Sequence, residues 1–271
     1  MRGAPGGRGG RLVAAAAVLG LATACGGQEA ELVSTPITSP PAPVEEAEEA
    51  VALRVDLDEV TGPLHDGAPV LDSSGHHLSG TVRLGGRVPA PLEPLVTEGG
   101  GAALRMSPPC EADDDSCPRG VLEFAGTDLL NPGTRDFRWG ARVLLAADET
   151  DEGSNIMQKG FNEGGRSQWK LQVDGDKGRP SCVLVGENGE EALVTAAEGI
   201  ADGAWHEVEC VRSGGVLAVL VDGVESRSKP VPPAMSVRPP SAVRVGGKSI
   251  KPGNDQFHGV VDDIFVAVTI D

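Results

Sequence analysis

The best-spaced residues for acid–base chemistry are Glu207 and Glu209, two glutamates in "WHEVECV" (205–211). Residues two apart on a strand share a face, and retaining glycosidases hold two carboxylates about 5 to 5.5 Å apart. Their strands carry acids two and four residues apart, but Val211 occupies the place of the third acid. We therefore expect both glutamates to form a solvated face rather than a catalytic pair.

Other catalytic and metal-binding patterns are weaker still. The sequence has no G-x-S-x-G motif for a serine nucleophile, and the adjacent His76 and His77 would project oppositely from a strand. An acidic run could bind calcium or form a solvent-exposed charge cluster, and it comprises Glu111, Asp113, Asp114 and Asp115. The sequence predicts that the protein is not an enzyme, with a glycoside hydrolase or lyase as the less favoured alternative.

Aromatic side chains for stacking on sugars are scarce. The chain has three tryptophans, five phenylalanines and no tyrosine. Trp139, Trp169 and Trp205 are all predicted to lie in the core, which leaves Phe161 in "KGFNEGG" as the notable loop aromatic. A sugar site would then depend on Asn155, Phe161, Asn162 and Arg166.

Five cysteines divide into one and four. Cys25 follows an apolar run near the N-terminus, and the other four lie in the body of the chain. Two disulfides are the simplest interpretation in an exported protein, Cys110 with Cys117 and Cys182 with Cys210. Zinc is a poor alternative, because neither C-x-x-C spacing nor clustered histidines occur.

The first 24 residues have the features of an export signal, with three arginines followed by a short uncharged run (12–24). The segment "LATACGG" resembles the lipobox of bacterial lipoproteins, although Ala22 replaces its usual large aliphatic residue. This resemblance implies a signal peptide over 1–24 and a lipid on Cys25, which anchors the protein to the membrane. We expect the extracytoplasmic face of the cell membrane, with release to the extracellular space as the alternative.

Net charge limits the partners. The chain carries a formal net charge of −17, which disfavours nucleic acid. Residues 25–50 are rich in proline and glutamate and contain no lysine or arginine, so they are predicted to form a disordered tether. The folded domain is predicted over residues 51–271.

Strand signals recur through this domain. In "FRWGARVLL" (137–145), "WKLQVD" (169–174) and "VVDDIFVAVTI" (260–270), apolar residues alternate with other positions at a period of two. "VDGV" (221–224) and "RSGGV" (212–216) are typical of hairpin turns. The pattern predicts an all-β sandwich of antiparallel sheets.

Several of these segments resemble laminin-G-like domains of the concanavalin A-like lectin superfamily. The matching motifs are "VLDSSGHHLSGTV", "NIMQKG", "DGAWHEVECVRSGGVLAVLVDGVE" and "FHGVVDDIFV", in order over residues 51–271. The resemblance implies a two-sheet jelly-roll sandwich whose relatives bind glycans or proteins. It also implies a structural Ca²⁺ site, in which Asp262 on the closing strand would meet Asp58 on the first.

The sequence thus predicts a lipid-anchored binding module for a cell-envelope glycan or an extracellular protein. A structural envelope module without a small ligand is the main alternative.

Overall fold

The computed structural model describes residues 49–110, 114–151, 153–161 and 167–270. Sixteen strands and two 3-10 turns, η1 (Asp128–Leu130) and η2 (Ala147–Glu149), form the regular structure of these residues. No helix in this part of the chain is long and apolar enough to cross a membrane. The strands are β1 (Glu49–Val55), β2 (Pro69–Val70), β3 (Gly80–Gly85), β4 (Glu93–Val96), β5 (Ala102–Arg105), β6 (Arg119–Phe124), β7 (Phe137–Leu144), β8 (Ser154–Gly160), β9 (Gln168–Asp174), β10 (Arg179–Val185), β11 (Glu191–Thr195), β12 (Trp205–Ser213), β13 (Val216–Val221), β14 (Val224–Pro230), β15 (Val243–Val245) and β16 (Val260–Thr269).

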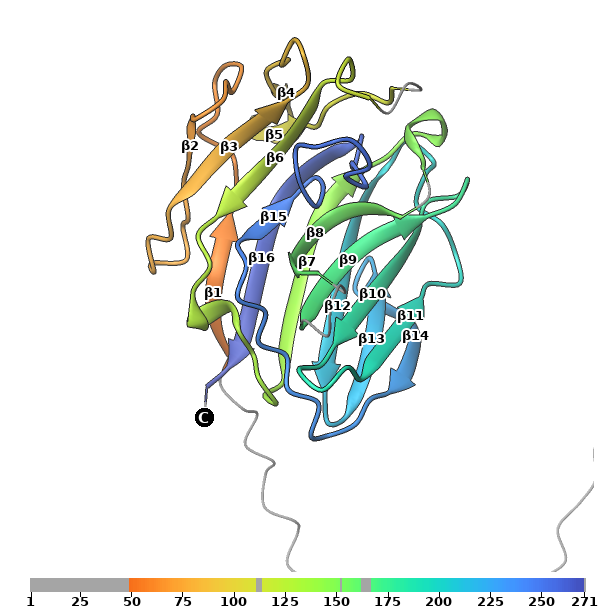
Figure 1. Ribbon diagram of the computed structural model, residues 1–271. Coiled ribbons are helices and arrows are strands. Elements are labelled where there is room, and N and C mark those ends of the chain that lie inside the picture. The colour runs from red at the N-terminus through yellow and green to blue at the C-terminus, as the bar shows by residue number, and fades with distance from the viewer. Residues whose placement is uncertain (1–48, 111–113, 152, 162–166, 271) are drawn as a thin grey trace, which may run out of the picture. The chain divides into compact units, whose positions relative to one another are not determined.

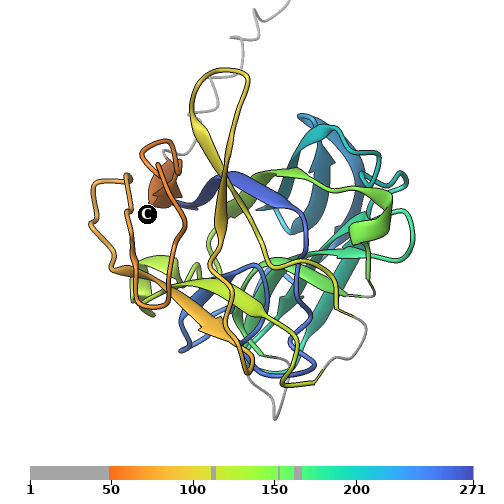
Figure 2. The same cartoon turned by 90° about the horizontal axis from the view of Figure 1, so that it is seen from above.

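Two antiparallel eight-stranded sheets pack face to face (Figure 1). Sheet I has the order β14-β13-β12-β7-β16-β5-β4, with β1 also paired to β16. Sheet II has the order β11-β10-β9-β8-β15-β6-β3-β2. Seen from above, the first strands and their loops lie at one side of the sandwich and the β13–β14 hairpin at the other (Figure 2). The predicted all-β, two-sheet sandwich is confirmed.

Alternating side chains of both sheets fill the space between them. Phe137, Trp139 and Trp169 are fully buried, and the ring centroids of Phe137 and Trp139 lie 4.5 Å apart. Cys182 in β10 is bonded to Cys210 in β12, so one disulfide joins the two sheets. A second disulfide closes the short loop between Cys110 and Cys117. Both predicted pairings are confirmed.

Two cationic side chains are buried with the core. Lys159 donates hydrogen bonds to Asn131 Oδ1 and to the carbonyl oxygen of Pro239, and burial lowers its pKa to about 8. Arg212 Nη1 donates to the carbonyl oxygen of Gly133 at 3.0 Å. Since buried cations are costly unless they are hydrogen-bonded, these contacts fix the loops between the sheets.

Strand β1 begins at Glu49, earlier than expected. Glu49 and Ala50, which the sequence analysis placed in the tether, pair with Thr269 and Val268 of β16. The composition of residues 25–50 is typical of a tether, but the last two of them continue β1 by pairing with the end of β16. Residues 1–48, including the predicted signal peptide and Cys25, lie outside the described residues, so those assignments stay predictions.

Candidate functional site

A groove of about 460 Å³ lies on the face of sheet I that is turned away from sheet II. We call it the outer-face groove and define it by Glu49 (β1), Arg138 (β7), Glu207 and Glu209 (β12), and Asp263 and Phe265 (β16). Strand register brings these residues together, because Gly140 of β7 pairs with Glu209 on one side and Phe265 on the other. Since side chains alternate along each strand, they share the outer face.

Gly140 shapes the floor of the groove. A Cβ atom at this position would lie 2.6 Å from the carbonyl oxygen of Val208 and 2.9 Å from Cε1 of Phe265. The close approach is open only to glycine, and it lets the Phe265 ring lie across the strand. The groove therefore has a half-buried aromatic surface beside its charged residues.

Arg138 is the centre of the charged cluster. Its Nε lies 3.1 Å from Glu209 Oε1 and 3.4 Å from Glu49 Oε2, and its guanidinium carbon lies 5.5 Å from the Phe265 ring centroid. Arg138 Nε and Glu209 Oε1 are close enough for an ion pair, yet neither has a hydrogen-bond partner among the described protein atoms. Both atoms are buried and face each other, so a ligand can reach only the rest of the Arg138 side chain, which is 43% exposed, and the exposed part of Glu209.

Glu209 differs from its neighbour Glu207. Glu207 is exposed, as the sequence predicted, but only 20% of the Glu209 side chain is accessible. Burial raises the pKa of Glu209, the carboxylates of Glu49 and Glu207 raise it further, and Arg138 opposes them. The expectation that both glutamates form a solvated face is therefore wrong for Glu209, because β7 and β1 place side chains around it.

Trp205 lies on the same outer face and not in the core. Its ring lies under Arg142, with 4.4 Å between the guanidinium carbon and the ring centroid, and it is partly exposed. Arg142 Nη1 also lies 3.6 Å from Asp262 Oδ2. The prediction that Trp205 is a core residue is wrong, since it has the strand phase of Glu207 and not that of the buried Val208.

The predicted calcium ligands interact electrostatically but do not form an evident cation site. Burial raises the pKa of Asp262 to about 6, with further contributions from Asp263 and Asp58, while Arg142 opposes them. The Asp58 carboxylate lies beside Gly101, where an added Cβ atom would come within 2.0 Å of its Oδ1. Calcium takes six to eight oxygen ligands, and the described residues contain no group of three or more His, Cys, Asp or Glu suited to a metal. This donor set fits calcium poorly, and the site stays a prediction that carries no function here.

Asn155 and Phe161, the two described residues of the predicted sugar site, are not brought together. Asn155 is fully buried, and its Nδ2 donates to Gln158 Oε1 at 2.8 Å. It lies near the start of β8, and Phe161 follows the end of that strand, about 20 Å away for six residues. Phe161 is half-buried, with Arg244 5.8 Å from its ring centroid. Asn162 and Arg166 lie outside the described residues, as do Glu111 and Asp113.

Sequence reasoning missed Gly140, Arg138, Phe265 and Glu49. Alternation in 137–145 puts Arg138 opposite the apolar residues of its strand, but nothing in the sequence pairs it with β12 and β1. The available signal was strand phase, which puts Arg138, Glu209 and Phe265 on positions opposite to the apolar ones.

A family model described as the concanavalin A-like lectin/glucanases superfamily matches residues 130–267, which include β7, β12 and most of β16 but not β1. No curated protein matches the chain in sequence. Among solved structures, the chain is similar to domain 4 of AbnA, a GH43 extracellular arabinanase from Geobacillus stearothermophilus, in complex with arabinotriose. The TM-score is 0.56 at 14% identity, over 82% of this chain and 94% of that domain.

Two toxin domains have comparable similarity. The binding domain of Paraclostridial Mosquitocidal Protein 1 has a TM-score of 0.56 and 12% identity, over 82% of this chain and 50% of that one. The binding domain of Botulinum neurotoxin DC, in complex with rat synaptotagmin II, has a TM-score of 0.57 and 12% identity, over 82% and 49%. The chain spans about half the length of these toxin domains. At such low sequence identity, the similarity shows a shared fold alone.

Proposed function

Because the chain belongs to the concanavalin A-like lectin/glucanases superfamily, we propose that it is a binding module whose outer-face groove recognises a neutral oligosaccharide. The observation that carries the proposal is the arrangement of Phe265 beside Arg138 and Glu209. An aromatic face for a sugar ring lies next to a guanidinium-bearing side chain that is 43% exposed and a carboxylate-bearing side chain that is 20% exposed.

The charge of the groove favours an uncharged glycan. Four carboxylates line it, from Glu49, Glu207, Glu209 and Asp263, against the two arginines Arg54 and Arg138. An acidic sugar would be repelled, whereas hydroxyl groups both donate to carboxylates and accept from guanidinium groups. The domain solved with arabinotriose, which matches over 94% of its own length, supports a neutral ligand of this kind.

One observation favours a second candidate, glycoside hydrolysis. Glu209 has a raised pKa and shares a strand face with Glu207, and glycosidases use two carboxylates of unequal pKa. Arg138 works against this role, because its ion pair stabilises the charged form of Glu209. Binding is therefore the primary proposal.

Titration calorimetry of the chain with arabinotriose and a neutral glycan array, each with and without calcium, tests the function. We expect Phe265→Ala to weaken binding about tenfold, the loss of one stacking contact of about 1.4 kcal/mol. Phe161→Ala is the matched control, since this half-buried ring just after β8 also lies under an arginine. Equal losses in both variants, or silence of every neutral glycan, would contradict the groove proposal, and released shorter sugars would favour hydrolysis.

We also propose that the chain is held at the extracytoplasmic membrane face by a lipid on Cys25, as the lipobox-like segment indicates. Cys25→Ala should move the protein from the membrane fraction to the soluble fraction. Retention of the variant at the membrane would contradict the anchor without affecting the groove.

A further inference from the structure

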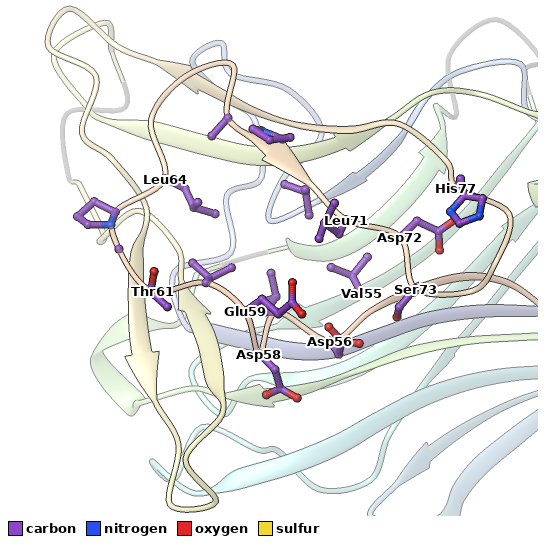
Figure 3. A pocket seen from close by; sticks show the side chains of 17 residues that line it. Val55, Asp56, Asp58, Glu59, Thr61, Leu64, Leu71, Asp72, Ser73 and His77 are labelled. Carbon is purple, nitrogen blue, oxygen red and sulfur yellow. The ribbon is translucent and has the colours of Figure 1, made fainter.

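A second cavity, of about 880 Å³, lies within the segment 55–77 (Figure 3). We name it the edge cleft. It begins where β1 ends and is bounded by β2, the last strand of sheet II. The residues that line it are all different from those that line the outer-face groove, so it is a separate site.

Hydrogen bonds fix the walls of the cleft. Asp72 accepts from the backbone N–H groups of Arg54, Ser74 and Leu78 and from the Ser74 hydroxyl. Leu64 and Leu92 exchange backbone hydrogen bonds of 2.8 and 3.1 Å. The cavity is therefore formed before any ligand arrives, which lowers the entropic cost of binding.

The cleft combines an apolar interior with an acidic wall. Val55, Leu57 and Val70 are buried, while Leu71 is 68% exposed. Figure 3 shows Asp56 and Glu59 along one wall and Leu64 and Leu71 along the other. No lysine or arginine is among the described residues that line the cleft, and His77 is the lining residue with a titratable base.

We propose that the edge cleft binds a basic peptide segment, with aliphatic side chains on its apolar wall and lysine or arginine against Asp56 and Glu59. Charge complementarity selects this occupant, because three acids besides the wall anchor Asp72 line the cleft and no lysine or arginine is among its described lining residues. A second copy of this chain, with its net charge of −17, is a poor match.

The position of the cleft suits an extended peptide. β2 ends sheet II, whereas the edge of β1 beside the cleft is already occupied at Arg54, whose backbone N–H donates to Asp72 Oδ1 and whose carbonyl oxygen accepts from Ser73 N–H. Strands at the edge of a sheet present backbone groups to which an added strand can bind. A peptide can therefore add backbone contacts to those of its side chains.

Fluorescence anisotropy of the purified chain with an acetylated, amidated peptide of three Leu-Arg repeats tests the proposal. The same peptide with citrulline in place of arginine keeps the shape and removes the charge. We expect the Kd of the arginine peptide to be about tenfold lower than that of the citrulline peptide, because citrulline cannot form the charge-assisted hydrogen bonds.

Matched variants separate the cleft from the general acidity of the chain. The double variant Asp56→Asn with Glu59→Gln should weaken binding about tenfold. The control, Glu191→Gln with Glu198→Gln, removes the same charge from exposed sites elsewhere and should change Kd less than about twofold. Leu71→Ser should weaken binding, and Leu193→Ser, which is 51% exposed on β11, should not. Equal losses in variants and controls, or equal binding of both peptides, would overturn the proposal and leave the groove untouched.

Discussion

The outer-face groove and the edge cleft are built by different means on one sandwich. The groove takes its residues from four strands far apart in sequence, β1, β7, β12 and β16, whereas the cleft is made by the single segment 55–77. Acids line both sites, but the groove adds two arginines and an aromatic ring, whereas the described lining of the cleft adds aliphatic residues and no lysine or arginine. Strand register thus creates a polar groove on the surface of sheet I. The segment 55–77 instead creates a cavity with buried aliphatic side chains in its wall.

The two sites also depend on different anchors. The Cys182–Cys210 disulfide lies beneath the groove, because Cys210 pairs with Trp139 in the register of β12 with β7. The cleft instead depends on the Asp72 carboxylate and its four hydrogen bonds. Each site should therefore be weakened by a change that spares the other.

The largest expected effect comes from Cys182→Ala with Cys210→Ala. Loop-closure entropy for the 28-residue separation predicts a loss of about 3 to 4 kcal/mol in the free energy of unfolding, measured by urea titration. Cys110→Ala with Cys117→Ala is the control, and its shorter loop predicts about 2.5 kcal/mol. A larger loss from the short pair would refute the importance assigned to the joint between the sheets.

Removing the anchor of the cleft should cost less. Asp72→Ala leaves buried donors unpaired and should lower the free energy of unfolding by about 2 to 3 kcal/mol. Amide exchange should rise in segment 54–78, while binding at the groove is retained. Asp66→Ala, which removes the acceptor of one hydrogen bond from Leu84 N–H, should cost less. Uniform faster exchange over the whole domain would argue against a local anchor.

Filling the floor of the groove is the third test. Gly140→Ala forces the Phe265 ring aside and should cost about 1 to 2 kcal/mol of stability together with glycan affinity. Gly99→Ala is the control, since nothing lies within 4 Å of a Cβ atom there. Peptide binding at the cleft should be the same in both variants, and unchanged glycan affinity in Gly140→Ala would contradict the geometry of the groove.

The smallest effect concerns pH. The pKa of Glu209 is raised in the folded protein by burial and by Glu49 and Glu207, so the folded state binds this proton more tightly than the unfolded state. Its contribution to stability is therefore present below the ordinary pKa of 4.5 and is lost as pH rises through the folded pKa. Glu209→Gln should flatten this part of the Tm profile, measured from pH 4 to 7. A parallel profile in the variant would show that the carboxylate is not perturbed.

Much of the fold was readable from strand phase alone. The burial of Trp139 and Trp169 followed from period-two patterns, because each inward face must be apolar, whereas the Cys182–Cys210 pairing was expected from the number of cysteines in an exported protein. Trp205 was misplaced because its expected role came from a family position, while its own phase matched the outward glutamates. Local pattern was the better guide there.

The candidate sites were less predictable than the fold. Asn155 was selected as a polar loop residue, yet β8 begins at Ser154 and buries it. Arg138, Glu209 and Glu49 became neighbours only through the pairing of β7 with β12 and the long-range closure of β1 on β16. A single sequence contains no signal for either register.

By itself, the amino-acid sequence determined the all-β class and the facing of apolar residues, since these depend on alternation and turn chemistry within short segments, and the number of cysteines indicated two disulfides. Tertiary structure decided which outward residues meet, because cross-strand register is set by the packing of the whole sandwich. Gly140 shows this most clearly. A Cβ atom there would collide with the ring of Phe265, a residue 125 positions later in the chain.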